Sequence, residues 1–206
     1  MTKARGPVWH QQQRKQGIVP VGLTGLDRDA TWSYAHADGW VYGHGTFCVV
    51  SPHTPVLGLL PWMPNTAHEA QRLKTAIVRF AGVVKTVGMD SKADDQKLYT
   101  LLKQEYQMQL LTVPRHGMDK TPGRRAMSRE MQTPGNRRTY RQRATTVEPR
   151  QGLVKELFAL QTCGMRGDAS NRWLFAAMGI AVQIAQRQAW RHGTSTWNIK
   201  EGVLGL

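Results

Sequence analysis

The sequence predicts an α/β domain, because segments with strand character alternate with segments of helical periodicity along most of the chain. Residues 40–50 and 83–89 are rich in β-forming side chains. A segment with apolar residues at helical spacing lies between them, and another follows residue 89. Such an alternation of strands and helices is typical of α/β folds. With 206 residues and 40% hydrophobic content, the chain can bury one core, so a single domain over 1–206 is expected.

The first half predicts a loop-rich lead-in over 1–38 and an α/β core over 39–113. Thr66-Ala-His-Glu69 is a capping box that opens a helix, and Gly82 is placed to end it. Asp94 or Asp95 is expected to cap the next helix. The predicted strands are 40–50, 56–60, 83–89 and 108–113, and the inward-facing positions of the second helix are Leu98, Leu101 and Leu102.

The second half predicts a basic loop or insertion over 114–139, interrupted by Pro and Gly, and a helical part over 140–190. Thr146 can cap a helix over 146–161, with Pro149 in its first turn, where a missing N–H does little harm. Ser170 is expected to cap a last helix that Gly193 ends. Its predicted core positions are Trp173, Leu174, Ala177, Met178, Ala181 and Ile184.

The charge of the chain indicates a polyanionic partner. The formal net charge is +14. Residues 114–155 contain eleven Lys and Arg against three Asp and Glu, a net charge of +8, so more than half of the excess lies in about a fifth of the chain. This clustering favours a nucleic-acid face. The same segment has too many Pro and Gly for a basic helix that lies on a membrane surface.

The remaining composition favours a cytoplasmic protein without a membrane span. No apolar run approaches the roughly 18 residues that a spanning helix needs. The two cysteines, Cys48 and Cys163, are far apart in the sequence and lack the neighbours of a zinc site, so reduced thiols in a cytoplasm are the simplest interpretation.

A short motif near the C-terminal third is the best candidate for chemistry. Glu148 is a lone carboxylate with Tyr140 and Arg143 before it and Lys155 two helical turns after it. A carboxylate oxygen can bind a divalent cation, and the flanking cations can bind DNA phosphates, as a metal-dependent phosphodiester enzyme requires. The alternative is a solvated basic helix with an incidental glutamate, and spacing alone weights the two about equally.

The motif resembles the Tyr–Arg–Glu–Lys signature of bacterial insertion-sequence transposases, which have a DDE catalytic domain of the ribonuclease H type. Six residues separate Glu148 from Lys155, as in that signature, whereas four separate Arg143 from Glu148 where three is commonest. The resemblance extends over nearly the whole chain through segments that begin at Gly6, Asp27 and Gly39. It implies a ribonuclease H-like mixed sheet flanked by helices, with DNA strand cleavage and transfer as the activity.

The resemblance also implies the second catalytic carboxylate. Residues 83–90 end on Asp90 just past a predicted strand, and the Asp94-Asp95 pair and Leu98 that follow match the family in spacing. Ala93 stands where the family commonly has Tyr. By resemblance, Asp90 and Glu148 are catalytic and bind Mg²⁺ or Mn²⁺, and Tyr140, Arg143 and Lys155 bind DNA.

The first catalytic aspartate of the family has no counterpart at the matching place. It lies a few residues before the segment that here begins at Ala4, and Asp27 and Asp29 match a later family segment. An N-terminally truncated copy with an incomplete first strand is therefore expected, with weakened metal binding and little or no activity. Double-stranded DNA is the implied partner, and a full-length form would be a possible homodimer.

Two other functions compete with the enzyme. The chain could be a non-catalytic remnant that binds DNA phosphates through its basic segment. A weaker alternative is an RNA- or ribosome-associated protein that uses residues 114–155 as its contact surface.

Overall fold

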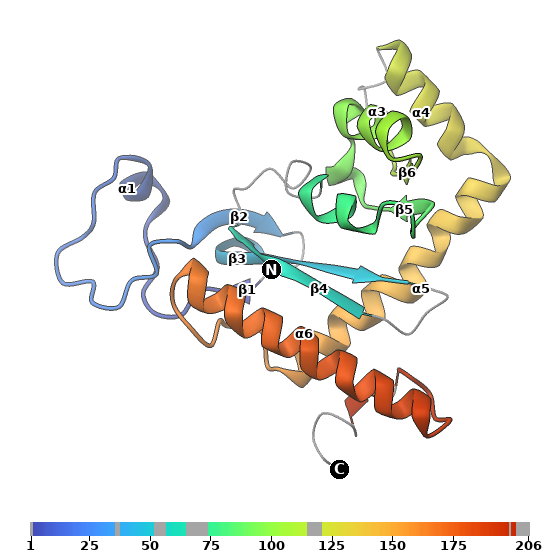
Figure 1. The fold of residues 1–206 in the computed structure, drawn as a ribbon. Coiled ribbons are helices and arrows are strands. Elements are labelled where there is room, and N and C mark those ends of the chain that lie inside the picture. Colours follow the sequence, from blue (N-terminus) through green and yellow to red (C-terminus); the bar gives the residue numbers. More distant parts are fainter. Residues whose placement is uncertain are drawn as a thin grey trace. The chain divides into compact units, whose positions relative to one another are not determined.

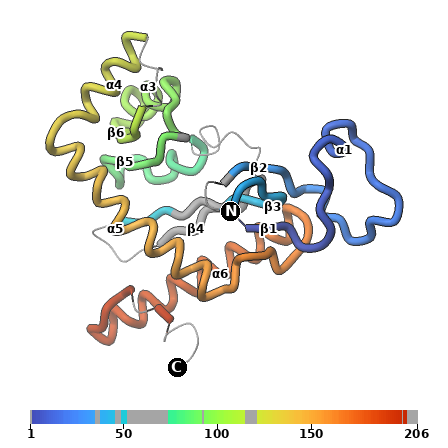
Figure 2. The backbone as a smooth tube through the Cα atoms, turned by 180° about the vertical axis from the view of Figure 1, so that it is seen from behind, coloured from blue at the N-terminus to red at the C-terminus, as the bar shows by residue number. Residues whose placement is uncertain are grey.

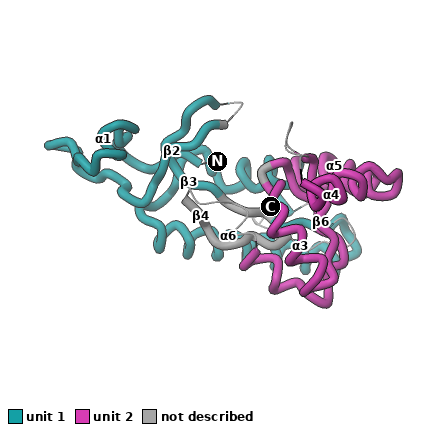
Figure 3. Tube along the Cα trace, turned by 90° about the horizontal axis from the view of Figure 1, so that it is seen from above, with its two compact units in different colours: residues 1–67, 149–206 teal, residues 68–148 magenta. Residues whose placement is uncertain are grey.

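The computed structural model describes residues 2–35, 38–51, 57–64, 74–114, 121–197 and 199–200. Within them the protein is a mixed α/β structure, as predicted (Figure 1). The chain divides into two compact units, one formed by residues 1–67 and 149–206 and the other by residues 68–148 (Figure 3). We call them unit 1 and unit 2 and describe each by itself.

Unit 1 contains a four-stranded antiparallel sheet centred on its longest strand, β3. β1 and β2 lie on either side of β3, and β4 also pairs with it (Figure 1). The strands are β1 (Thr2–Lys3), β2 (Thr31–Ala35), β3 (Gly39–Val50) and β4 (Leu57–Pro64), and a short helix, α1 (Gln11–Lys15), lies between β1 and β2 in the chain. The strand predicted at 40–50 is therefore confirmed, whereas the lead-in also holds two strands.

The N-terminal strand is fixed in the sheet by a close approach that requires glycine. A Cβ added to Gly43 of β3 would lie 2.0 Å from the carbonyl oxygen of Thr2, so any other side chain would separate the two strands. On its other side β1 bonds to the segment after α5, because Lys3 N donates to Gln161 O and Cys163 N donates to Lys3 O. Figure 2 shows this start of the chain beside β3.

Two long helices complete unit 1. The helix α6 (Asp168–Arg191) packs against β4, and the C-terminal part of α5 (Pro134–Leu157) contributes Val154 to the same core. The buried residues of this core are Val154, Leu160, Cys163, Phe175, Val182, Ala185 and Ile199. A second small core joins Trp9, Ala30 and Tyr42.

The start and the inward face of α6 differ from the prediction. The helix begins at Asp168 and not after Ser170, because the carboxylate of Asp29 accepts the Asp168 N–H at 2.8 Å and so serves as a remote cap. Trp173 and Ile184, predicted as core, are 67% and 55% exposed. The residues of α6 that are buried are Asn171, Phe175, Gly179, Val182, Ala185 and Gln186. The end is as predicted, with Gly193 at φ 66°.

Unit 2 is built on two parallel strands joined by a helix. β5 (Thr86–Gly88) pairs in parallel with β6 (Gln109–Leu111), and α3 (Gln96–Glu105) connects them. Asp95 caps α3 as predicted, accepting from Lys97 N and Leu98 N. Leu98 and Leu102 are buried, whereas Leu101 is half-buried.

The start of unit 2 is described only in part. The capping box at Thr66–Glu69 lies outside the described residues; residues 74–77 are helical and continue into a 3-10 turn, η1 (Val78–Phe80). Gly82 follows at φ 81°, as expected of a helix end.

The described strands form two sheets, whereas the sequence predicted one mixed sheet. β5 and β6 pair only with each other in the described part of the chain, and the antiparallel sheet belongs to unit 1. Each of these two strands has three residues, so they form a much smaller sheet than the predicted segments at 83–89 and 108–113 implied.

The segment predicted as a basic loop is helical where the structure describes it. A helix, α4 (Pro122–Gln132), begins after Thr121, whose hydroxyl accepts from Arg124 N, and α5 follows after Thr133. Pro122 and Pro134 each occupy the first helical position, where proline is favourable, so they start helices and do not break them.

The helix predicted to begin at Thr146 is the second half of α5. The Thr146 hydroxyl donates backward to the carbonyl of Gln142 at 2.7 Å, so it is bonded within the helix and does not cap a new one. Pro149 consequently lies inside the helix, where it removes one backbone donor.

Candidate nucleic-acid interface and carboxylates

Asp90 lies at the carboxyl end of a parallel strand, as predicted. Its carbonyl oxygen accepts from the Thr112 hydroxyl at 2.7 Å and from Ala93 N at 3.1 Å, and the preceding Met89 N donates to Leu111 O of the neighbouring strand. These bonds fix the backbone of Asp90 between the ends of β5 and β6. The carboxyl ends of strands in open parallel sheets are where α/β proteins place their ligands.

The next aspartate is a structural residue. The Asp94 side chain is fully buried and forms an ion pair with Arg124 at 3.0 Å, and Arg124 also donates to the Asp94 carbonyl. This pair joins the start of α3 to the start of α4. Arg124 therefore stabilises unit 2, although it belongs to the basic segment predicted to bind DNA.

A second polar group joins the same two helices. The carboxylate of Glu130 on α4 accepts hydrogen bonds from the Tyr99 hydroxyl, from Lys103 Nζ at 2.9 Å and from Gln109 Nε2 at 2.8 Å. Burial raises the pKa of Glu130, but these three donors outweigh it and hold that pKa below its usual range. Glu130 thus remains charged and fixes α4 against α3 and β6.

Three residues of the signature contact one another along α5. The Arg143 guanidinium lies 5.4 Å from the centre of the Tyr140 ring, and its Nη2 is 3.8 Å from Oε1 of Glu148. The side chain of Glu148 is 61% exposed, so this ion pair is weak. The structure therefore brings Arg143 into contact with both Tyr140 and Glu148.

The unusual spacing between Arg143 and Glu148 has a visible consequence. At about 100° per residue, five positions place Arg143 about 140° around the helix from Glu148. Only the length of the arginine side chain allows the 3.8 Å contact. Lys155, seven positions after Glu148, lies about 20° from it around the helix. Lys155 is exposed and belongs to the part of α5 in unit 1.

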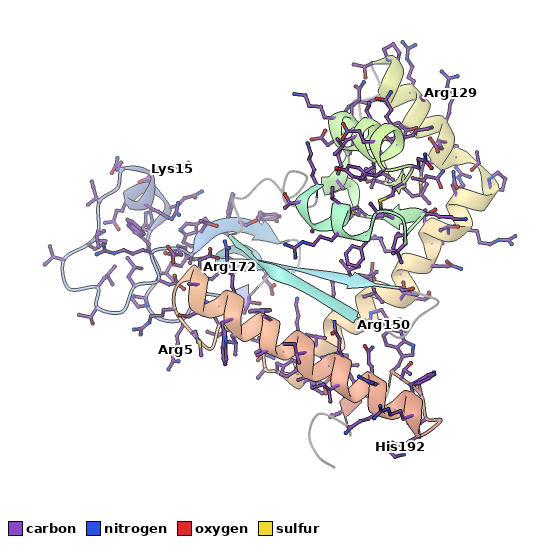
Figure 4. All side chains as sticks on the ribbon, in the orientation of Figure 1. Arg5, Lys15, Arg129, Arg150, Arg172 and His192 are labelled. Atoms are coloured by element: carbon purple, nitrogen blue, oxygen red, sulfur yellow. The ribbon has the colours of Figure 1, made fainter. Side chains whose placement is uncertain are left out.

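Exposed arginines form what we call the basic face of α4 and α5. It comprises Arg125, Arg129, Arg137, Arg138 and Arg141. Figure 4 labels one of them, Arg129 on α4. Arg125 and Arg129 are one turn apart on α4, as are Arg137 and Arg141 on α5. Within the described part of the chain, no acidic side chain pairs with any of the five.

The described residues contain no cluster of three or more His, Cys, Asp or Glu side chains that could hold a metal ion. Asp27 and Asp29, which match a later segment of the family and are not predicted site residues, have structural contacts. Asp27 is buried against His44, with Oδ2 and Nε2 2.9 Å apart, and Asp29 caps α6. The Asp27–His44 pair could not be predicted from the sequence, since 17 positions separate its members.

Comparison with family models, curated proteins and solved structures found no match to this chain. Among the helices that the structure describes, none is long and apolar enough to cross a membrane.

Proposed function

We propose that this chain is a DNA-acting protein of the DDE transposase class. In this proposal the basic face of α4 and α5 binds DNA phosphates, together with Tyr140, Arg143 and Lys155. Asp90 and Glu148 are the carboxylates for Mg²⁺ or Mn²⁺. The observation that supports it best is that Asp90, at a parallel strand end, and the contacting Tyr140–Arg143–Glu148 group belong to one compact unit.

The proposed fold is of the ribonuclease H type. Two features support this proposal: a parallel β5–α3–β6 unit with Asp90 after its first strand, and an antiparallel sheet formed by the preceding strands.

The donor chemistry fits one divalent cation. Mg²⁺ and Mn²⁺ favour carboxylate oxygens, and both Asp90 and Glu148 supply them. Two-ion cleavage needs further carboxylates, because both ions must be held a few ångströms apart. Since the described residues contain no such cluster, we derive no cleavage step from the structure.

A non-catalytic DNA-binding protein is the second candidate. It is favoured by the exposure of Glu148 and by its ion pair with Arg143, which together suit a solvated helix surface. The basic face would be the same in both cases, so metal binding separates the two candidates.

Titration of the chain with Mn²⁺, followed by electron paramagnetic resonance of the free ion, tests the proposal. One weak site is expected, and Asp90→Asn or Glu148→Gln should each lower its affinity at least about tenfold, because even indirect metal contacts have effects of that size. Arg143→Gln should leave Mn²⁺ affinity nearly unchanged, since its ion pair with Glu148 is weak.

Glu156→Gln is the matched control for this titration. Glu156 is an exposed carboxylate on the same helix, paired with Lys200 at 3.3 Å, and its replacement should have no effect. Wild-type Mn²⁺ affinity in both Asp90→Asn and Glu148→Gln would leave only the DNA-binding candidate.

A further inference from the structure

Two arginines of unit 1 belong to one small area, at the segment that precedes α6. Arg5 follows β1, and its Nη1 donates to the carbonyl oxygen of Gly164 at 2.5 Å (Figure 4). Arg166 lies two residues further along the same segment, and its Nε is 3.4 Å from the position that a Cβ on Gly6 would take. Both arginines are exposed. We call them the arginine pair of unit 1.

Gly25 fixes the orientation of the Arg166 guanidinium. A Cβ added to Gly25 would lie 2.6, 2.6 and 2.7 Å from Cζ, Nη2 and Nη1 of Arg166. Because these three atoms of a planar group are almost equally distant, the flat face of the guanidinium covers the glycine. Only a residue without a side chain leaves room for this contact. The guanidinium is thus oriented before a ligand binds, which reduces the entropy lost on binding.

The N–H donors on the edge of this guanidinium are not used by the protein. In the part of the chain that the structure describes, Arg166 has neither a hydrogen-bond acceptor nor a carboxylate within ion-pair distance. Nearby carboxylates have other partners, because Asp29 accepts from Asp168 N at 2.8 Å and Asp168 pairs with Arg172 at 2.6 Å. An oriented guanidinium with unused edge donors suits the two oxygens of a phosphate or carboxylate.

The charge around the arginine pair favours a polyanion as its ligand. Residues 1–26 contain four Lys and Arg and no Asp or Glu, and residues 158–167 contain one Arg and no acidic residue. The first acidic residue of the chain, Asp27, is buried against His44. A ligand with several phosphates is attracted by all of these cations, whereas a single carboxylate would use the arginine pair alone.

We propose that the arginine pair binds the phosphate backbone of DNA, as a second contact in addition to the basic face of unit 2. Arg166 binds one phosphate through two N–H donors, and Arg5 adds a second charge. This inference rests on the proposed function, because that function supplies DNA as the polyanion. Contacts of this kind position the nucleic acid without reading its sequence.

Fluorescence anisotropy of a labelled duplex, measured with the full chain at several salt concentrations, tests this contact. Arg166→Gln should weaken binding about tenfold and reduce the slope of log affinity against log salt by about 0.9, because one phosphate is no longer neutralised. Arg166→Lys should restore the slope, since the charge remains, but only part of the affinity, since an ammonium group lacks the planar pair of donors. Lys15→Gln removes one exposed charge of α1 and should leave the slope nearly unchanged.

Two glycine variants separate the orientation of Arg166 from its charge. Gly25→Ala should displace the guanidinium and weaken DNA binding without changing the net charge. Gly22→Ala is the matched control, because both glycines have positive φ, 74° and 85°, but a Cβ on Gly22 would meet nothing within 4 Å. Circular dichroism spectra verify that both variants fold.

Three results would overturn the inference. Wild-type affinity and slope in Arg166→Gln would refute it and leave the proposed function intact, as would equal losses of affinity in Gly25→Ala and Gly22→Ala. Equal effects of Lys15→Gln and Arg166→Gln would show that DNA responds to net charge alone. A wild-type chain that binds no duplex DNA even at low salt would refute the proposed function and this inference with it.

Discussion

The affinity of the chain for duplex DNA should fall by about three to five orders of magnitude between about 50 and 200 mM salt, if about 6–10 phosphates are neutralised. The physical reason is the release of counterions from the phosphates that the basic face contacts. No dependence on sequence is expected, because contacts to phosphates carry no sequence information. Fluorescence anisotropy of labelled duplexes of two unrelated sequences, titrated at several salt concentrations, measures both effects.

Substitutions can measure how much of this salt dependence of DNA affinity comes from the basic face. Replacing Arg125, Arg129, Arg138 and Arg141 with Gln should reduce the slope of log affinity against log salt by up to about 3.6, at about 0.9 for each phosphate that is no longer neutralised. These four side chains are exposed and lie on two successive helices.

A matched control removes the same charge from another part of unit 2. Lys74, Arg79, Lys85 and Lys97 are all exposed and lie outside α4 and α5. Replacing these four residues with Gln should change the slope little. Equal reductions of the slope in the two quadruple variants would show that DNA responds only to net charge, and a wild-type affinity independent of salt would exclude phosphate binding.

His44→Ala should destabilise the chain by about 1–3 kcal/mol, because it removes the hydrogen-bond partner of the buried Asp27 carboxylate. Asp27 and His44 both have fully buried side chains and are 2.9 Å apart. The Tyr42 hydroxyl donates to the Asp27 carbonyl at 2.5 Å, so the same position also fixes β3 to the segment before β2. Urea denaturation of the variant and the wild type measures the difference in the free energy of unfolding.

The stability that Asp27 contributes should depend on pH in acid. Burial raises the pKa of Asp27, but the hydrogen bond and the charge of His44 outweigh it and hold that pKa below the ordinary value of 3.8. A carboxyl group whose pKa is lowered by folding makes its full contribution to stability at pH values above its unfolded-state pKa. This contribution is lost as the pH falls through the folded-state pKa. The wild type should therefore lose more stability than Asp27→Asn as the pH falls below about 4.

An exposed carboxylate provides the control for this pair. Asp38 lies just before β3 and is exposed, so Asp38→Asn should leave stability within about 0.5 kcal/mol of the wild type. If His44→Ala changed the free energy of unfolding as little as Asp38→Asn, the Asp27–His44 pair would have no structural role.

The sequence alone predicted those helix ends and strand ends that depend on neighbouring residues in the chain. Asp95 at the start of α3 and Gly82 and Gly193 after helices follow from residue type and position alone. The same holds for Asp90 at its strand end. The contacts of Arg143 with Tyr140 and Glu148 depend instead on α5 running through Thr146, where the sequence predicted a helix start.

Other features could not be predicted, because they depend on contacts that residue type alone does not determine. Proline is compatible both with a loop and with the first position of a helix, and the backward hydrogen bond of Thr146 decides the outcome for α5. In α6 both sides are apolar, so spacing could not select the side that packs on the core. The remote cap by Asp29 and the Asp27–His44 pair arise only when distant segments meet.

Cleavage of bound DNA by an iron chelate attached at position 148 tests the central claim most directly, since it reports whether DNA lies beside Glu148. The chelate is attached to Glu148→Cys in a Cys48→Ser background. Cys163 needs no replacement, because it is buried and desolvation raises the pKa of its thiol to about 12, so it remains unreactive. The control is Glu105→Cys, at the exposed end of α3. We expect hydroxyl-radical cuts in the duplex from position 148 and few from position 105. Equal cutting from the two positions, with DNA still bound, would contradict the proposed placement of DNA at the candidate carboxylates.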